Sequence, residues 1–206
     1  MNVKTKKGCV ILRFKYILFD LDGTLIDTNK LILDSFKHTI KEHLDIDVFD
    51  EDLLKYFGEP LIYTLQRYSM EKSHKMFETY IKYNEHHHDN SVLPCEGIED
   101  GLAELKDLGC TMAIVTSKRR DIATRGLKLF GFEKYFSAIV ALEDTEKHKP
   151  DADPIIEALK RLNADGGQAV MIGDSIYDIE CARNAGIKSI LVKWSMADGF
   201  QDKIIE

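Results

Sequence analysis

Side chains suited to metal and anion binding follow four short apolar segments of this 206-residue sequence. The segments are residues 16–19, 112–115, 138–142 and 169–172. The polar residues that follow them are Asp20, Asp22, Thr24, Thr116, Ser117, Lys118, Lys147, Lys149, Asp174, Ser175 and Asp178. An aspartate beside a metal ion and a lysine can attack phosphorus and form an acyl phosphate, so this set points to phosphoryl transfer.

Asp20 and Asp22 are the leading candidates for a metal site because both follow a very apolar segment. Burying two carboxylates two residues apart costs several kcal/mol unless a cation or hydrogen-bond donors compensate. A hard divalent cation with oxygen ligands is the natural compensation, and we expect Mg²⁺. Lys149 would add a second positive charge, and Gly23 lets the backbone approach an anion closely.

Simpler structural roles compete with these chemical ones. Asp174 or Ser175 could cap the helix that follows, since Asp and Ser are favoured at N-caps. Three consecutive histidines at residues 86–88 also suggest a metal site. Neighbouring residues of a helix point in different directions, so we interpret these histidines as part of a polar return linker.

The elements that must position these residues form an alternating pattern. The four apolar segments and a fifth, residues 189–192, are too short for helices and are predicted to be buried strands. Helical patterns cover residues 98–108, 121–130, 154–162 and 177–185. This alternation predicts an α/β fold with a Rossmann-like parallel sheet covered on both faces. Ligands bind beyond the carboxyl ends of such strands, where the polar residues would converge.

Residues 29–91 break the alternation, because their apolar spacing is helical and no strand pattern is evident. The segment holds nearly half of the aromatic residues, enough for a small core of its own. We therefore expect an all-helical cap domain at 29–91, inserted into a core domain of residues 1–28 and 92–206. Two short polar segments, Thr28-Asn29 and residues 88–91, would serve as hinges of a mobile lid.

Composition excludes several classes of protein. The chain has 28 Lys and Arg against 35 Asp and Glu, a net charge of −7 that argues against a nucleic-acid partner. The sequence has no apolar run long enough to span a membrane. Four widely spaced cysteines (Cys9, Cys95, Cys110 and Cys181) are expected to be reduced thiols, and we expect a cytoplasmic protein.

The order of the motifs resembles one known family. D-x-D-G-T at residues 20–24, Thr116-Ser117, Lys149-Pro150 and G-D-S-x-x-D at residues 173–178 resemble the haloacid dehalogenase superfamily, whose members are mostly Mg²⁺-dependent phosphatases. The resemblance covers the chain beyond the first dozen residues. The helical insert is similar to the cap that this family places between its first and second motifs.

The resemblance implies a role for each motif residue. Asp20 would be the nucleophile, and Asp22 the acid that protonates the leaving group and then activates water. The metal ligands would be Asp20, Asp174 and the main-chain carbonyl of Asp22, with Asp178 as a supporting acid. The substrate-binding and phosphate-binding residues would be Thr116, Ser117, Lys118 and Lys149. Lys147 is an alternative to Lys149, and Lys118 could instead be a solvated loop lysine.

The substrate remains open among small anionic phosphorylated molecules. The chain from residue 93 onward is similar to bacterial haloacid dehalogenase-type pyrophosphatases and to phosphoglycolate phosphatases, and a sugar-phosphate mutase is the alternative activity. Gly58-Glu59-Pro60 resembles a loop that phosphoglycolate phosphatase-like proteins point into the site, or it is an ordinary turn. Arg67 would contact the substrate or lie on the helix surface. The expected assembly is a monomer or a homodimer.

Overall fold

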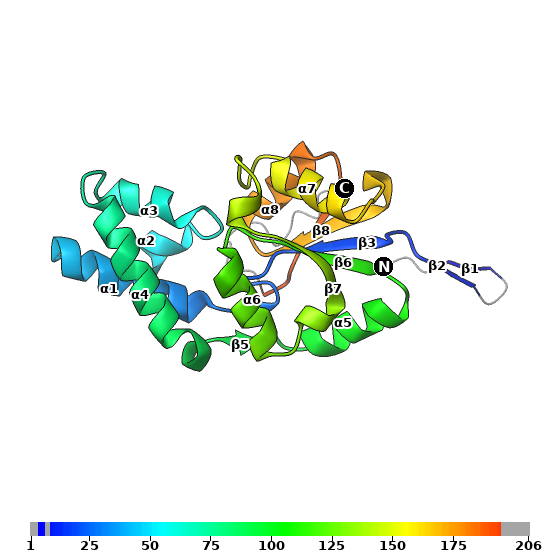
Figure 1. Ribbon diagram of the computed structural model, residues 1–206, viewed down its shortest axis with the longest axis horizontal. Helices are drawn as coiled ribbons and strands as arrows, with labels where there is room; N and C mark the ends of the chain where they lie inside the picture. The colour runs from blue at the N-terminus through cyan, green and yellow to red at the C-terminus, as the bar shows by residue number, and fades with distance from the viewer. Residues whose placement is uncertain (1–3, 7–8, 195–206) are drawn as a thin grey trace.

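The computed structural model describes residues 4–6 and 9–194, with side chains from residue 12 onward. Its centre is a five-stranded sheet in the order β7-β6-β3-β8-β9, with every neighbouring pair parallel (Figure 1). The strands are β3 (Tyr16–Phe19), β6 (Thr111–Val115), β7 (Phe136–Val140), β8 (Ala169–Gly173) and β9 (Lys188–Leu191). All five apolar segments form strands, so the predicted parallel core is confirmed.

Four helices cover the sheet. They are α5 (Ile98–Asp107), α6 (Arg120–Leu129), α7 (Asp153–Arg161) and α8 (Ile176–Asn184). Each begins and ends within one residue of the bounds expected from apolar periodicity. The periodicity is a reliable guide here because each helix packs one apolar stripe against the sheet.

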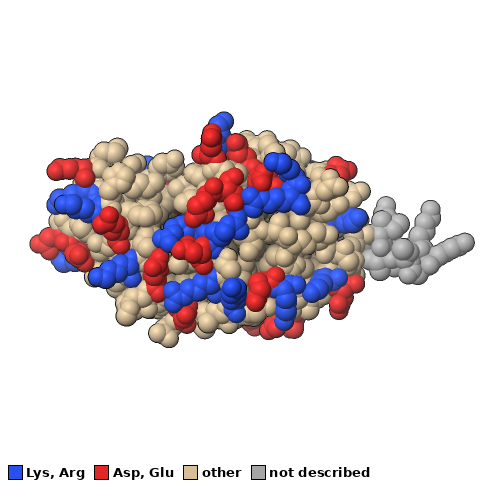
Figure 2. Space-filling view, in the orientation of Figure 1, with Lys and Arg blue, Asp and Glu red and all other residues tan. Residues whose placement is uncertain are grey.

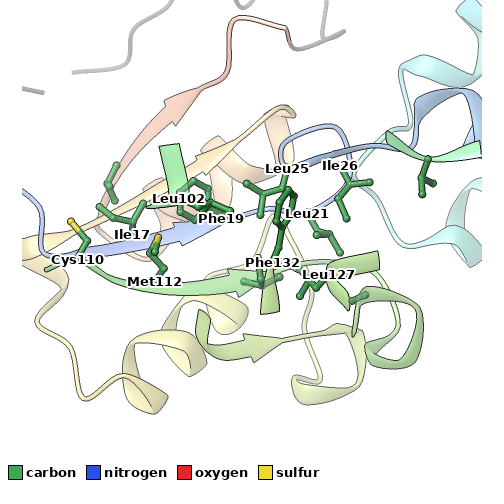
Figure 3. Packing of buried hydrophobic residues seen from close by; sticks show 14 of the residues in the cluster. Ile17, Phe19, Leu21, Leu25, Ile26, Leu102, Cys110, Met112, Leu127 and Phe132 are labelled. Atoms are coloured by element: carbon green, nitrogen blue, oxygen red, sulfur yellow. The ribbon is translucent and has the colours of Figure 1, made fainter. Parts of the chain in front are cut away.

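The side chains of β3 alternate between two cores, as the pleat requires. Ile17 and Phe19 pack with Leu102 of α5 and Leu127 of α6, in the cluster that Figure 3 shows. Leu18 points the other way, into a second cluster that includes residues of α7 and α8. Burial on both faces explains why this strand is apolar without interruption, and it leaves polar residues only at the strand ends.

The insert is helical throughout its regular structure and lies to one side of the sheet (Figure 1). Its helices are α1 (Asn29–Leu44), α2 (Asp50–Leu54), α3 (Leu61–Tyr68) and α4 (Ser73–Ser91). A third buried cluster lies inside it, built on residues such as Phe36, Leu65 and Tyr80. The segment therefore has its own core, as its aromatic content indicates.

The chain enters and leaves the insert through two short strands that pair with each other. β4 (Ile26–Asp27) and β5 (Leu93–Pro94) form an antiparallel pair. The expected polar linker, which comprised the histidines at residues 86–88 and the hinge at residues 88–91, is wrong, because all of these residues belong to α4. His88 is buried against α6, where a Cβ added to Gly126 would lie 3.7 Å from its ring. Tertiary packing, not local polarity, sets the end of this helix.

The expected strand at residues 138–142 is displaced by two residues, since β7 ends at Val140. The reason is a 3₁₀ turn, η2 (Leu142–Asp144), in which the Asp144 carboxylate accepts the Ala141 N–H at 2.7 Å. The remaining short elements are η1 (Glu133–Tyr135), η3 (Gly166–Gln168) and the antiparallel pair β1 (Lys4–Lys6) and β2 (Cys9–Ile11).

Lys and Arg side chains alternate with Asp and Glu across the face shown in Figure 2, so this face carries no broad basic patch. Among the described residues, no helix is both long enough and apolar enough to cross a bilayer. Cys95, Cys110 and Cys181 are free thiols, as expected. The side chain of Cys9 lies outside the described residues.

Candidate active site

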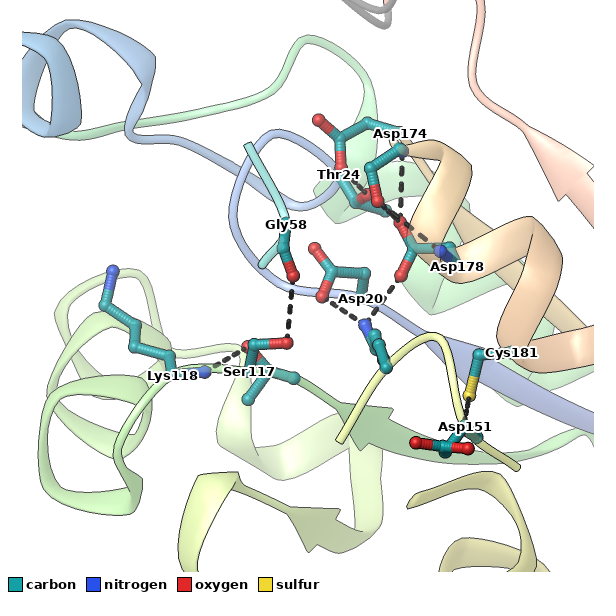
Figure 4. Close-up of polar contacts among 12 residues, drawn as sticks. Asp20, Thr24, Gly58, Ser117, Lys118, Asp151, Asp174, Asp178 and Cys181 are labelled. Atoms are coloured by element: carbon teal, nitrogen blue, oxygen red, sulfur yellow. Dashed lines mark hydrogen bonds and ion pairs between the residues drawn. The ribbon is translucent and has the colours of Figure 1, made fainter. Parts of the chain in front are cut away.

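The polar residues of the motifs converge at the carboxyl ends of three adjacent strands, β6, β3 and β8 (Figure 4). Asp20 follows β3 and donates its N–H to the Ile172 carbonyl of β8 at 2.9 Å. Thr116 follows β6, and its N–H is bonded to the Val140 carbonyl at 2.9 Å. The hydrogen bonding of the sheet thus continues one residue past each strand. It holds the main chain of Asp20 and Thr116 in place, and with it the starting point of each side chain.

Three carboxylates and one lysine form the buried centre of the site. Asp20, Asp174 and Asp178 each place a carboxylate oxygen within 4.8 Å of the others. Lys149, which is 4% exposed, donates to Asp20 Oδ1 at 2.7 Å and to Asp178 Oδ1 at 2.6 Å. The exposed Lys147 does not take part in these ion pairs, so the geometry favours Lys149 over its sequence neighbour.

Burial shapes the electrostatics of this cluster. Desolvation raises the pKa of Asp20 to about 7, against the opposing effect of Lys149, with Asp178 adding to the rise. Desolvation also raises the pKa of Asp174 well above its ordinary value, and Asp20 and Asp178 act in the same direction. Burial would lower the pKa of Lys149, but the two carboxylates raise it. The carboxylates therefore exceed the positive charge available from Lys149.

Ser175 caps α8, whereas Asp174 does not. The Ser175 hydroxyl accepts the Asp178 N–H at 3.4 Å, and Asp178 Oδ2 accepts the Ser175 N–H at 3.0 Å and its hydroxyl at 2.7 Å. Both oxygens of Asp178 are thus occupied, one by Lys149 and one by Ser175. Asp178 anchors the lysine, while the Asp174 carboxylate remains directed toward the D-x-D-G-T turn.

That turn approaches Asp174 very closely. A Cβ added to Gly23 would lie 2.3 Å from Asp174 Oδ2, and Gly23 has a positive φ of 76°. Only glycine fits such a position without strain. The Thr24 hydroxyl donates to Asp174 Oδ1 at 3.4 Å. Thr24 belongs to the D-x-D-G-T motif, but the motif alone did not indicate this contact.

Asp22 and Lys118 form a third ion pair in the site. The Lys118 ammonium lies 2.7 Å from Asp22 Oδ1, and the two side chains are 14% and 22% exposed. The Thr116 hydroxyl accepts the Lys118 N–H at 3.1 Å. Lys118 is therefore not a freely solvated loop lysine. The carboxylate of Asp22 lies outside the group formed by Asp20, Asp174 and Asp178.

The insert reaches the site through the turn at Gly58-Glu59-Pro60. The Ser117 hydroxyl donates to the Gly58 carbonyl at 3.1 Å (Figure 4). A Cβ added to Gly58 would lie 2.7 Å from Ser175 Oγ, so the turn packs closely on the core. Of the two interpretations of this segment, these contacts favour the loop that reaches the site over an ordinary turn between helices, and the contact with Ser117 spans 59 residues.

Glu59 connects the turn to α3 of the insert and to α8 beside the sheet. Its carboxylate accepts the Thr64 hydroxyl at 2.7 Å and lies 3.2 Å from Arg67 Nη2. The Tyr177 hydroxyl of α8 donates to Glu59 at 3.4 Å. Arg67 is 52% exposed and lies on the helix surface, where its guanidinium pairs with Glu59. No motif indicated Tyr177, since its role depends only on the approach of the insert.

Comparisons with known proteins agree with this geometry. Residues 17–192 match the model of a family described as haloacid dehalogenase-like hydrolases. A Caldanaerobacter subterraneus protein named "Putative pyrophosphatase PpaX" is 51% identical over 185 residues, which are 90% of this chain and 84% of that protein. Pyrophosphatase PpaX of Halalkalibacterium halodurans is 41% identical over 87% of this chain and 84% of its own length. The solved structure of a predicted phosphatase from Clostridium acetobutylicum has a TM-score of 0.81 and 31% identity, covering 91% of this chain and 88% of that one.

Proposed function

The chain belongs to the haloacid dehalogenase-like hydrolases, and we propose that it is a Mg²⁺-dependent hydrolase of inorganic pyrophosphate that acts through an aspartyl phosphate on Asp20. The observation that carries this proposal is the placement of Asp20. Its carboxylate lies at the end of the central strand, bonded to Lys149 at 2.7 Å and within 4.8 Å of Asp174 and Asp178.

The reaction proceeds in two displacements. A carboxylate oxygen of Asp20 forms a bond to phosphorus while the bond to the leaving oxygen breaks, and Asp22 donates its proton to that oxygen. Water then attacks the phosphorus of the acyl phosphate while the bond between phosphorus and the Asp20 oxygen breaks. A proton of the water passes to Asp22, phosphate is released, and the Asp20 carboxylate is restored. Lys149 and the Thr116 hydroxyl hold the phosphoryl oxygens in place.

The excess of buried carboxylate charge fits a divalent cation bound through oxygen atoms. Asp20, Asp174 and the main-chain carbonyl of Asp22 would hold Mg²⁺, which neutralises charge on the phosphoryl oxygens when it is bound. We assign Asp178 to Lys149 and not to the metal, because both of its oxygens already accept hydrogen bonds.

The names of two relatives favour pyrophosphate over phosphoglycolate as the substrate. Two relatives that are 51% and 41% identical carry the name pyrophosphatase PpaX, the first of them with the qualifier quoted above. Lys118 lies at the site with its ammonium on Asp22, where it can transfer to a second anionic group of the substrate, and both pyrophosphate and phosphoglycolate carry such a group. Residues 29–91 act as the cap domain, and the Gly58-Glu59 turn limits the space to small phosphorylated molecules.

Phosphate release from a panel of small phosphorylated substrates tests this proposal. With Mg²⁺, kcat/KM should be highest for pyrophosphate, lower for phosphoglycolate and lower still for p-nitrophenyl phosphate. Lys118→Ala should raise the KM for pyrophosphate by a larger factor than that for p-nitrophenyl phosphate, since only the first has a second anionic group. Preference for phosphoglycolate, equal KM effects or full activity in excess chelator would contradict the proposal.

A further inference from the structure

The segment that follows β9 crosses the carboxyl end of β8 and places a tryptophan at the D-x-D-G-T turn. The Val192 N–H is bonded to the Gly173 carbonyl at 2.9 Å, which directs the chain toward the site. Two residues later, Trp194 Nε1 donates to the Gly23 carbonyl at 3.1 Å, across 171 residues of sequence. The Trp194 side chain is 47% exposed, so burial of the ring alone does not explain its position.

This hydrogen bond completes the attachment of Gly23. The Gly23 N–H is bonded to the Ile26 carbonyl at 2.8 Å, inside the turn. Its carbonyl is held from outside by Trp194, so both peptide groups that flank this residue are fixed. Gly23 is also the residue whose backbone faces the Asp174 carboxylate, leaving no room for a Cβ. A rotation of either peptide group would therefore change the distance between the turn and Asp174.

The Cys95 thiol interacts with residues on both sides of the D-x-D-G-T turn. Burial is the main cause that raises the pKa of the Cys95 thiol to about 12, and Asp27 and Asp174 add to the rise. A hydrogen bond with Trp194 acts in the opposite direction. Both Trp194 and Asp174 therefore affect the ionisation of this thiol.

We propose that Trp194 is a positioning residue, whose indole N–H holds residues 22–24 against Asp174 and thereby sets the affinity of the site for its divalent cation. The main-chain carbonyl of Asp22 follows β3, whereas the carboxylate of Asp174 follows β8. Because these two groups belong to separate segments, both can face one ion only if the turn at residues 22–24 is held in place. Precise support of ligand groups by outer hydrogen bonds is a general requirement of metal sites. This inference rests on the metal-dependent function proposed above.

Two substitutions separate the N–H from the bulk of the ring. Trp194→Phe keeps an aromatic ring without the donor. Trp194→His is smaller but retains a ring N–H at the equivalent position, Nε2. Loss of one hydrogen bond should weaken cation binding about fivefold in the phenylalanine variant, with histidine within about twofold of the wild type. Lys106→Met is the matched control, since Lys106 donates to the Lys134 carbonyl at 3.1 Å, away from the site.

Cation binding is measured directly, by the electron paramagnetic resonance signal of free Mn²⁺ in the presence of each protein. Trp194 is the single tryptophan of the sequence, so its fluorescence in the wild type should change with the same midpoint. A steady-state assay should then show the Mg²⁺ requirement of the phenylalanine variant shifted by the same factor.

The outcomes are distinct. Weaker Mn²⁺ binding by the phenylalanine variant, restored by histidine, supports the positioning role. Equal binding by all variants, or tighter binding with phenylalanine than with histidine, overturns it and leaves the proposed hydrolysis untouched. A wild-type protein that binds no Mn²⁺ would overturn the metal-dependent function, and this inference with it.

Discussion

Replacing Lys149 with methionine removes the cation at the centre of the carboxylate cluster and keeps most of the side-chain volume. Its ammonium lies 2.7 Å from Asp20 and 2.6 Å from Asp178, and its side chain is 2% exposed. The variant would leave three carboxylates within 4.8 Å of one another without this counterion. Both stability and catalysis should suffer, for separate reasons.

Removing one partner of a buried ion pair costs about 3–5 kcal/mol, because the other charge stays buried and uncompensated. The raised pKa of Asp20 allows it to take up a proton, so we expect the lower end, about 3 kcal/mol. For a chain of this length, about 2–4 °C per kcal/mol corresponds to a fall in Tm of roughly 6–12 °C. Mg²⁺ should recover part of this loss, since a second cation can take the place of the ammonium.

Thermal unfolding in chelator and in Mg²⁺ measures these effects, with Lys147→Met as the control. Lys147 lies two residues away on the same loop and is exposed, so its substitution should change Tm by less than about 2 °C. In the assay, Lys149→Met should lose about 10²–10³ in kcat, the usual cost of one electrostatic contact to a transition state. A Tm within about 1 °C of the wild type, or an equal loss in Lys147→Met, would refute the reasoning.

Three further predictions concern Asp20, Asp22 and His88. Asp20→Asn should fold but lose at least about 10³-fold in kcat, because an amide does not attack phosphorus. Phosphate release measures this loss, and substantial turnover would contradict the assignment of Asp20 as nucleophile. Asp22→Asn should lose more activity on an alkyl phosphate than on p-nitrophenyl phosphate, because only the poorer leaving group needs a proton, and equal losses would assign Asp22 to another role. Burial lowers the pKa of His88, and the charges of Lys118 and Arg125 act in the same direction, against the opposing effect of Asp89. The neutral form of His88 therefore stabilises the fold above about pH 6.5, and this contribution is lost as the pH falls below that value. His88→Gln should therefore show a smaller fall in Tm from pH 7 to pH 5 than the wild type, and parallel curves would exclude this contribution.

The positions of the candidate site residues along the chain follow from local sequence alone. Residues 16–19, 112–115 and 169–172 are apolar without interruption because β3, β6 and β8 are buried on both faces. A strand of this kind can carry polar groups only at its ends. The sequence therefore predicts both that Asp20, Thr116 and Asp174 are site residues and that they lie close together at one edge of the sheet. The helical insert is predictable for the same reason, since its apolar spacing and aromatic content give it a core.

The pairing of charges in the site was decided by tertiary structure. Lys149 meets Asp20 across 129 residues, Lys118 meets Asp22 across 96, and Trp194 meets Gly23 across 171. Each contact depends on the conformation of a loop and on the direction of a long side chain, and neither produces a periodic pattern in the sequence. Tertiary contacts also decide two smaller features. β7 ends at Val140 because the Asp144 carboxylate binds the Ala141 N–H and turns the chain, and His88 is buried because α6 packs on α4. Local patterns record which residues are buried, whereas contacts between distant loops are set only when the sheet and the insert pack together.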